Sequence, residues 1–301
     1  MSLITALPGA AAQGLIWGIM AIGVYITFRI LDIADLTVDG TLCTGGAVCI
    51  MMMLSGHNVW VSMLVATGAG LLAGLATGIF HTFMGIPAIL AGILTQLSLY
   101  SVNLKIMGKA NQAINVDKFN LLVSLRRVKG VALTQNTLFI VAIMIIILIA
   151  FLYWFFGTEL GCSLRATGCN PSMSRAQGIN TDRNKVLGLM LSNGLVALSG
   201  ALLTQYQGFA DINMGRGSIV IGLAAVIIGE AIFSRIFRNF ALKLLSVVFG
   251  SILYYLVLQI VIWMGIDTDL LKMLSALVVA FFLAFPYWKG KYFTKAKQGG
   301  K

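Results

Sequence analysis

Long apolar runs alternate with short polar segments along most of this sequence. The runs lie near residues 10–28, 41–55, 58–80, 86–103, 135–156, 186–206, 218–234, 241–264 and 269–288. Most of them match the roughly 20 helical residues that cross the apolar part of a bilayer. An α-helix satisfies its own backbone hydrogen bonds, so it is the form that such runs take in lipid. The pattern predicts an all-α, polytopic integral membrane protein with about nine transmembrane helices, in which residues 1–301 form a single transmembrane domain.

The composition favours a membrane protein over an ordinary soluble one. Hydrophobic residues make up 59% of the chain and charged residues 10%, whereas a soluble domain carries about 25% charged residues. We therefore expect membrane lipid around the chain. The net charge of +11 does not indicate a nucleic-acid partner, because basic residues also gather in the cytoplasmic loops of membrane proteins.

Basic residues gather in three polar segments, 161–185, 235–243 and 289–301. Placing these segments in the cytoplasm satisfies the positive-inside rule. The C-terminus is then cytoplasmic and the N-terminus, after an odd number of crossings, is outside. One segment on the outer side, 104–134, is also basic and runs against the rule.

The basic segment 104–134 mixes apolar residues with its charges. A short helix over residues 117–128 would place Phe119, Leu122 and Leu125 on one side. Such a helix would rest on the membrane or contact an extracellular partner. An ordinary solvated loop is the alternative.

Small residues recur in the apolar run 58–80. Gly70, Gly74 and Gly78 are spaced every four residues, with Gly68 nearby, so the three share one face of a helix on which another helix can approach closely. The face is either a moving helix contact or a site of plain tight packing.

The segment 161–185 carries helix signals inside a polar loop. Asn170 can cap a helix start, Pro171 suits the first helical position, and Gly178 suits the left-handed residue just after the end. Together they predict a short helix near 171–177. Thr181 with Asp182 then predicts the start of the next long helix. A short helix bounded at both ends is a rigid projection on which a partner can act.

The same segment resembles the cytoplasmic loop of permeases in the branched-chain amino acid and ribose ABC importer families, the type II importers. The resemblance rests on Gly161, Arg165-Ala166, Asn170, Arg175-Ala176 and Gly178-Ile179. Segments 33–46 and 222–233 resemble other parts of those permeases and extend the resemblance over most of the chain. In those families the loop frames a coupling helix that sits in a cleft of the ATPase. The resemblance implies that loop 161–183 contacts an ATPase through Arg165, Asn170, Pro171, Arg175 and Gly178.

The resemblance also implies partners and a location. The chain would be the permease subunit of an ABC importer in the bacterial cytoplasmic (inner) membrane. ABC ATPase subunits would bind the ATP, so this chain itself would carry no cofactor. An extracellular or periplasmic solute-binding protein would deliver a small solute, and a second permease copy would complete a homodimer. The preferred cargo is an amino acid, with aromatic amino acids among the candidates, and a sugar or nucleoside is the alternative.

Acidic residues lie between the first two apolar runs. Asp35 and Asp39 flank Thr37 in a segment rich in glycine and hydroxyl side chains. Charged groups at membrane depth are costly unless they face a cavity or an aqueous end, and such a segment can form a broken helix that lines a pathway. We interpret Asp35, Thr37 and Asp39 as part of the translocation pathway. A polar turn at the membrane surface is the alternative.

Residues 210–218, ADINMGRGS, echo residues 34–41, ADLTVDGT. Each segment follows an apolar run, and the two preceding runs cross in opposite directions, as in an inverted repeat. The echo predicts an outer counterpart made of Asp211, Asn213 and Arg216, near the site where a binding protein docks. Glu230, further along, is expected to pair with Arg235 or Arg238.

Several motifs of other protein classes are absent. The sequence lacks G-x-x-x-x-G-K-[ST], CxxC, HExxH and GxSxG, and it has two histidines. These absences argue against ATP binding by this chain, a metal site and an intramembrane enzyme. An ion-coupled secondary transporter or channel remains the alternative class, although runs 135–156, 186–206 and 241–264 hold almost no charged residue.

Overall fold

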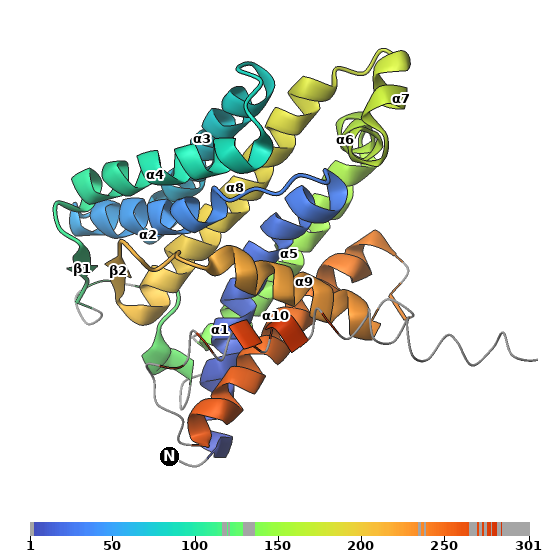
Figure 1. Cartoon of the computed structure of the whole chain (residues 1–301). Helices are drawn as coiled ribbons and strands as arrows, with labels where there is room; N and C mark the ends of the chain where they lie inside the picture. Colours follow the sequence, from blue (N-terminus) through green and yellow to red (C-terminus); the bar gives the residue numbers. More distant parts are fainter. Residues whose placement is uncertain are drawn as a thin grey trace, which may run out of the picture.

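A computed structural model describes residues 3–115, 119, 121–128, 136–233, 236–237, 239–264 and single positions between 270 and 284. Most of this part of the chain is helical (Figure 1). The helices are α1 (Leu3–Tyr25), the π-helix η1 (Ile26–Ile30), α2 (Val38–Leu54), α3 (Val59–Thr82), α4 (Ala88–Met107), the 3-10 helix η2 (Leu125–Val128), α5 (Thr137–Gly157), α6 (Glu159–Cys169), α7 (Pro171–Ala176), α8 (Thr181–Gln207), α9 (Ser218–Phe233) and α10 (Phe240–Trp263).

The described helices confirm the prediction of an all-α, polytopic membrane protein. Six of them are long and apolar enough to cross a bilayer, namely α1 with η1, α3, α4, α5, α8 and α10. The runs predicted at 41–55 and 218–234 correspond to α2 and α9, which are shorter apolar helices. The run at 269–288 lies mostly outside the described residues.

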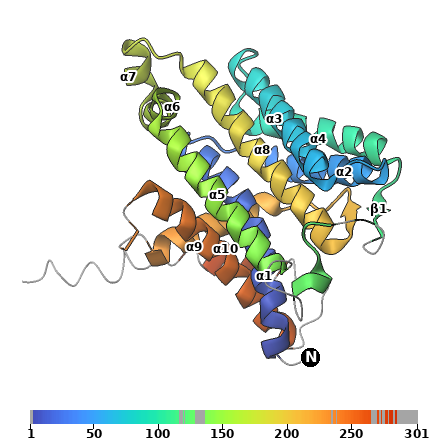
Figure 2. The same cartoon turned by 180° about the vertical axis from the view of Figure 1, so that it is seen from behind.

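Helix α8 runs through the middle of the bundle (Figure 1). Helices α2, α3 and α4 lie on one side of it and α1, α9 and α10 on the other, while α5 packs along α1, as the view from behind shows (Figure 2). Most of α1 and α8 is buried, whereas α4 and α5 are largely exposed. The most exposed helices are thus those that face lipid or a partner.

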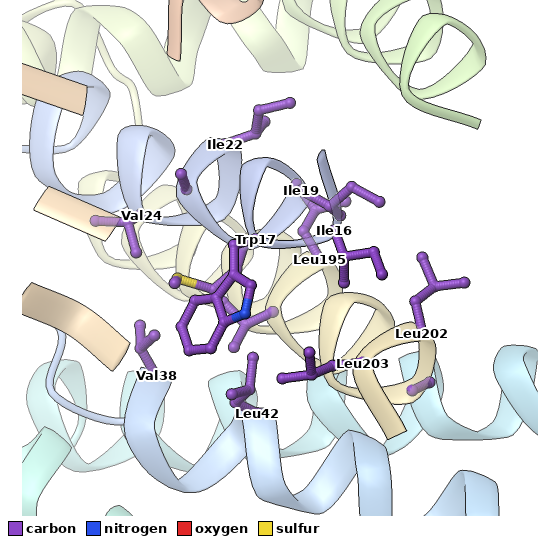
Figure 3. Close-up of a cluster of buried hydrophobic side chains, with 14 of the residues drawn as sticks. Ile16, Trp17, Ile19, Ile22, Val24, Val38, Leu42, Leu195, Leu202 and Leu203 are labelled. Carbon is purple, nitrogen blue, oxygen red and sulfur yellow. The ribbon is translucent and has the colours of Figure 1, made fainter. Parts of the chain in front are cut away.

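Close packing of α1, α2 and α8 forms the centre of the core (Figure 3). Its side chains include Ile16, Trp17, Ile19, Ile22, Val24, Val38, Leu42, Leu195, Leu202 and Leu203, all of them buried. In lipid, apolar burial does not favour helix association as it does in water, so close van der Waals packing and interhelical hydrogen bonds hold such a bundle together.

The glycines of α3 show how close this packing is. A Cβ atom added at Gly70 would overlap the carbonyl oxygen of Asn193, and one at Gly74 would overlap that of Leu189; one at Gly78 would lie 3.0 Å from the Cα of Val186. These contacts, all with α8, favour the tight-packing interpretation of this glycine face. At Gly68 nothing lies within 4 Å of an added Cβ.

Gly74→Ala is therefore expected to destabilise the bundle far more than Gly68→Ala in the same helix. Overpacking of a core costs about 1–3 kcal/mol, and the atom met at position 74 is backbone, so α8 must shift as a whole. Thermal unfolding of the two detergent-solubilised variants measures the difference. Equal melting temperatures would contradict the close approach of α3 to α8.

The segment after α4 packs onto the bundle. Strand β1 (Asn111–Ala113) pairs antiparallel with β2 (Phe209–Asp211), which follows α8. Further on, Leu121 and Val123 are buried, whereas Leu125 is 59% exposed. The expected helical face of Phe119, Leu122 and Leu125 is thus wrong in the described residues. The chain from Leu121 to Ser124 makes bends and no helical turn, and the short helix η2 follows it.

Candidate functional site

Helix α7 forms where the loop pattern predicts a short helix. The Asn170 side chain accepts a hydrogen bond from the Met173 backbone N–H at 3.0 Å, and Pro171 is the first helical residue. After the helix, Gly178 has φ +80°. The N–H of Ile179 donates to the Ser174 carbonyl at 3.0 Å, and that of Gly178 to the Arg175 carbonyl at 3.0 Å. These two bonds close the C-terminus with a Schellman arrangement, so both ends of α7 are fixed.

Arg175 joins α7 to the start of α8. Its Nε donates to the hydroxyl oxygen of Thr181 at 2.8 Å, and Thr181 is buried. The cap of α8 is Asn180, one residue earlier than expected, because its side chain accepts from the N–H groups of Asp182 and Arg183 at 3.2 and 3.0 Å. The Thr181 hydroxyl is thus free to hold Arg175.

One residue of the coupling set, Arg165, lies apart from α7. Arg165 is on α6, a helix that the sequence pattern missed, and its guanidinium lies 5.4 Å from the centre of the Phe240 ring. Met173, which the sequence reasoning did not select, is 61% exposed on α7. Figures 1 and 2 place α6 and α7 together at one end of the bundle, beside the start of α8. The signal that could have identified Met173 is that it is an apolar residue in an otherwise polar segment.

Asp35 is buried between η1 and α2. Its Oδ1 accepts from the Thr37 backbone N–H at 2.9 Å, and its Oδ2 accepts from Asn193 Nδ2 of α8 at 2.7 Å. Asp35 is 2% exposed and Asn193 0%. The carboxyl group is therefore enclosed by hydrogen-bond donors in this structure and does not lie at a polar surface.

Hydroxyl groups extend this contact across four helices. The Thr41 hydroxyl of α2 donates to Asn193 Oδ1 at 2.7 Å. The Thr37 hydroxyl lies 2.7 Å from that of Thr77 on α3, which donates to Thr95 on α4 at 3.0 Å. These buried groups, with Asp35, form what we call the buried polar network. Such fully partnered networks fix the relative positions of the elements that carry them.

Asp39 on α2 holds the start of α9. Its Oδ2 accepts from the Gly217 N–H at 2.9 Å, and its Oδ1 accepts from the Ser218 hydroxyl at 2.8 Å and the Ile219 N–H at 3.0 Å. Asp39 was a candidate from the sequence, but its partners lie about 180 residues away and carry no local signal.

The two echoing segments make the same local turn. The Thr37 N–H donates to Asp35 Oδ1 at 2.9 Å, and the Asn213 N–H donates to Asp211 Oδ1 at 2.7 Å. One segment leads into α2 and the other into α9, and these are the two shorter apolar helices. The echo seen in the sequence thus has a structural counterpart.

A cavity of ≈ 350 Å³ brings one residue of the expected pathway set together with one residue of the expected docking set. Asp39 and Arg216 both line it, and the Arg216 guanidinium lies 5.9 Å from the centre of the Tyr100 ring on α4. The other lining residues are Gly40, Cys43, Gln96, Leu97, Asn103 and Ile212. Concave, mostly apolar sites with a few polar groups are typical places for small ligands.

Two further expectations have different outcomes. Glu230 pairs with Arg29 at 3.0 Å, which joins η1 to α9. The expected partners Arg235 and Arg238 lie outside the described residues, so a pairing with either of them stays a prediction. No group of three potential metal-ligating side chains occurs among the described residues.

Comparisons with known proteins identify the family. Residues 7–283 match the branched-chain amino acid transport system permease component family. A tyrosine transport system permease protein of Clostridioides difficile is 38% identical over 272 residues, 90% of this chain and 88% of the relative. An uncharacterised protein of Rickettsia prowazekii is 38% identical over 281 residues, 92% of this chain and 95% of the relative. A fructose import permease protein of Bifidobacterium longum is 25% identical over 246 residues, 81% of this chain and 67% of the relative.

A solved structure shares the fold. PsaBC from Streptococcus pneumoniae in complex with Fab superposes with a TM-score of 0.55 at 16% identity, covering 98% of this chain and 99% of that one. At this identity the likeness shows the fold alone. The family match over most of the chain, together with the membrane-spanning helices, shows that this protein belongs to the branched-chain amino acid transport system permease family and is a multi-pass permease subunit of the ABC importer type.

Proposed function

We propose that this chain is the membrane-spanning subunit of an ATP-driven importer in the bacterial cytoplasmic membrane, with α7 on the cytoplasmic side. ATPase subunits dock on loop 161–183 and bind the ATP. A solute-binding protein delivers the solute from outside, near Asp211, Asn213 and Arg216, and a second copy of the chain completes the pathway. The observation that carries this proposal is α7, which is closed at both ends and joined to α8 by Arg175.

Helix α8 connects the proposed docking site with the buried polar network. Thr181 at its first residue accepts from Arg175, and Asn193 twelve residues later donates to Asp35. At 1.5 Å per residue these positions are about 18 Å apart along the helix axis. A displacement of α7 by the ATPase would therefore move Asn193 with α8, and with it the contacts that set the positions of α2, α3 and α4.

Purification of the tagged chain from its native membrane tests this proposal. An ATPase and a solute-binding lipoprotein are expected to co-purify, and uptake into proteoliposomes is expected to require both of them and ATP. Solute uptake by the isolated chain in ATP-free vesicles would instead identify an ion-coupled secondary transporter or a channel.

We further propose an aromatic amino acid as the solute. The named tyrosine permease is 38% identical over most of the chain, and the cavity beside Asp39 offers a guanidinium and an aromatic ring. Arg216 suits the carboxylate of an amino acid, because guanidinium–carboxylate pairs form two parallel hydrogen bonds. Tyr100 suits an aromatic side chain, which stacks on or packs edge-on to another ring.

Arg216→Ala is expected to raise the KM for tyrosine uptake about 10- to 100-fold, the range that a charge-assisted hydrogen bond of roughly 1.5–3 kcal/mol corresponds to. Arg216→Lys keeps the charge and is expected to lose less. Initial rates of labelled tyrosine uptake in proteoliposomes measure both values. An unchanged KM in Arg216→Ala would contradict the proposal that Arg216 binds the carboxylate of the solute. It would not contradict the proposal of ATP-driven import.

A further inference from the structure

Two neighbouring cavities lie where α6 packs near the end of α5 and the start of α10. Their volumes are ≈ 560 and ≈ 330 Å³, and both are lined by Arg165 and Phe240. The larger one opens against the end of α5, and the smaller one reaches Arg29 and Lys243. We propose that this joint cavity binds the phosphate of an anionic phospholipid.

The charge of the joint cavity is positive. Three basic side chains line it, Arg29, Arg165 and Lys243, against one acid, Glu230. Glu230 is already paired with Arg29 at 3.0 Å. In the part of the chain that the structure describes, no ion pair joins Arg165 or Lys243 to a carboxylate. Two cations are thus left to balance the charge of a bound anion.

The wall formed by α5 carries the kind of aromatic residues that are typical of a membrane interface. Tyr153 and Trp154 line the larger cavity, and they are 50% and 66% exposed at the end of the most apolar span. Tyrosine and tryptophan are enriched where the hydrocarbon meets the headgroups. The polar residues Thr158 and Asn239 line the same cavity, so apolar and polar walls meet there as acyl chain and headgroup do in a lipid.

These features favour an anionic lipid over an anionic solute as the ligand of this cavity. A transported solute has its candidate site against α4, whereas this cavity lies against α5 and α10. Basic pockets between transmembrane helices on the cytoplasmic side are typical sites for anionic headgroups. The leaflet follows from the proposed cytoplasmic position of α7, but the binding itself does not depend on that proposal.

The proposal gives Arg165 a role different from the ATPase contact implied by the family resemblance. Arg165 sits over the Phe240 ring at the start of α10, so a phosphate bound there would connect α6 with α10. The lipid would then hold the base of the coupling loop to the bundle, while the rest of loop 161–183, with α7, contacts the ATPase.

Native mass spectrometry of the detergent-solubilised protein tests the proposal, with phosphatidylglycerol and phosphatidylethanolamine offered in equal amounts. Wild-type protein is expected to retain at least several-fold more phosphatidylglycerol and to gain thermal stability from it. The double variant Arg165→Gln/Lys243→Gln is expected to lose most of this preference. Lys105→Gln removes an exposed lysine from the end of α4 and is expected to retain it.

Three results would overturn the proposal. The first is equal binding of the two lipids by the wild-type protein, which needs no variant to be folded. The second is the same thermal stabilisation by inorganic phosphate alone, which would identify a small-anion site. The third is loss of ATPase co-purification in the double variant with its lipid preference unchanged, which would return Arg165 to the ATPase interface.

Discussion

Asp35→Asn is expected to destabilise the protein by about 1–3 kcal/mol for each buried donor that loses its acceptor. Both carboxylate oxygens of Asp35 accept hydrogen bonds, one from the Thr37 N–H and the other from Asn193 Nδ2. An amide at this position replaces one acceptor with a donor, so an N–H group then faces another N–H group. The melting temperature of the detergent-solubilised variant measures the loss, and uptake is expected to fall with it.

Asp32→Asn is the matched control, because it makes the same substitution three positions earlier at an exposed residue. Asp32 has φ +55°, a conformation that asparagine tolerates well, so its melting temperature is expected to stay unchanged. A variant Asp35→Asn as stable as the wild type would show that this position holds a neutral carboxylic acid or that Asn193 reverses its amide.

Arg175→Ala is expected to reduce ATP-driven uptake about tenfold while ATP hydrolysis continues. The substitution removes the hydrogen bond from Arg175 to Thr181, and a charge-assisted bond of roughly 1.5 kcal/mol corresponds to a tenfold change in an equilibrium. Helix α7 then moves without carrying α8 with it. Uptake and hydrolysis are measured together in proteoliposomes that contain the whole importer.

Arg183→Ala is the control for charge, since Arg183 is exposed in the first turn of α8. In the described part of the chain its backbone N–H donates to Asn180, and its side chain makes no hydrogen bond. Equal loss of uptake in Arg175→Ala and Arg183→Ala would indicate that the loop acts through its charge and not through the contact with α8.

Asn170 provides a second test, because Asn170→Ala removes the cap of α7, whereas Asn170→Ser keeps a capping oxygen.

Features that depend on neighbouring residues could be predicted from the sequence. Asn170, Pro171 and Gly178 fix the ends of α7 through contacts within nine residues, so their spacing was sufficient. The apolar runs likewise predicted the spans, because length and hydropathy act locally. Helix α6 was missed because its composition is polar, although Thr158 followed by Glu159 is a start signal that was present.

Contacts between distant segments could not be predicted from one sequence. Asn193 lies 158 positions from Asp35, and the partners of Asp39 lie still farther along the chain. Polar composition indicated that both acids need partners at membrane depth, but it did not distinguish an enclosed group such as Asp35 from one that lines a cavity, such as Asp39.

The position of Asp39 has an electrostatic consequence for the cavity beside it. Asp39 lies in the first turn of α2 and also accepts from the first N–H groups of α9, so the positive ends of two helix dipoles compensate its charge. The compensated charge of Asp39 therefore does not neutralise Arg216. The guanidinium of Arg216 in the same cavity is then available to a solute that carries a carboxylate.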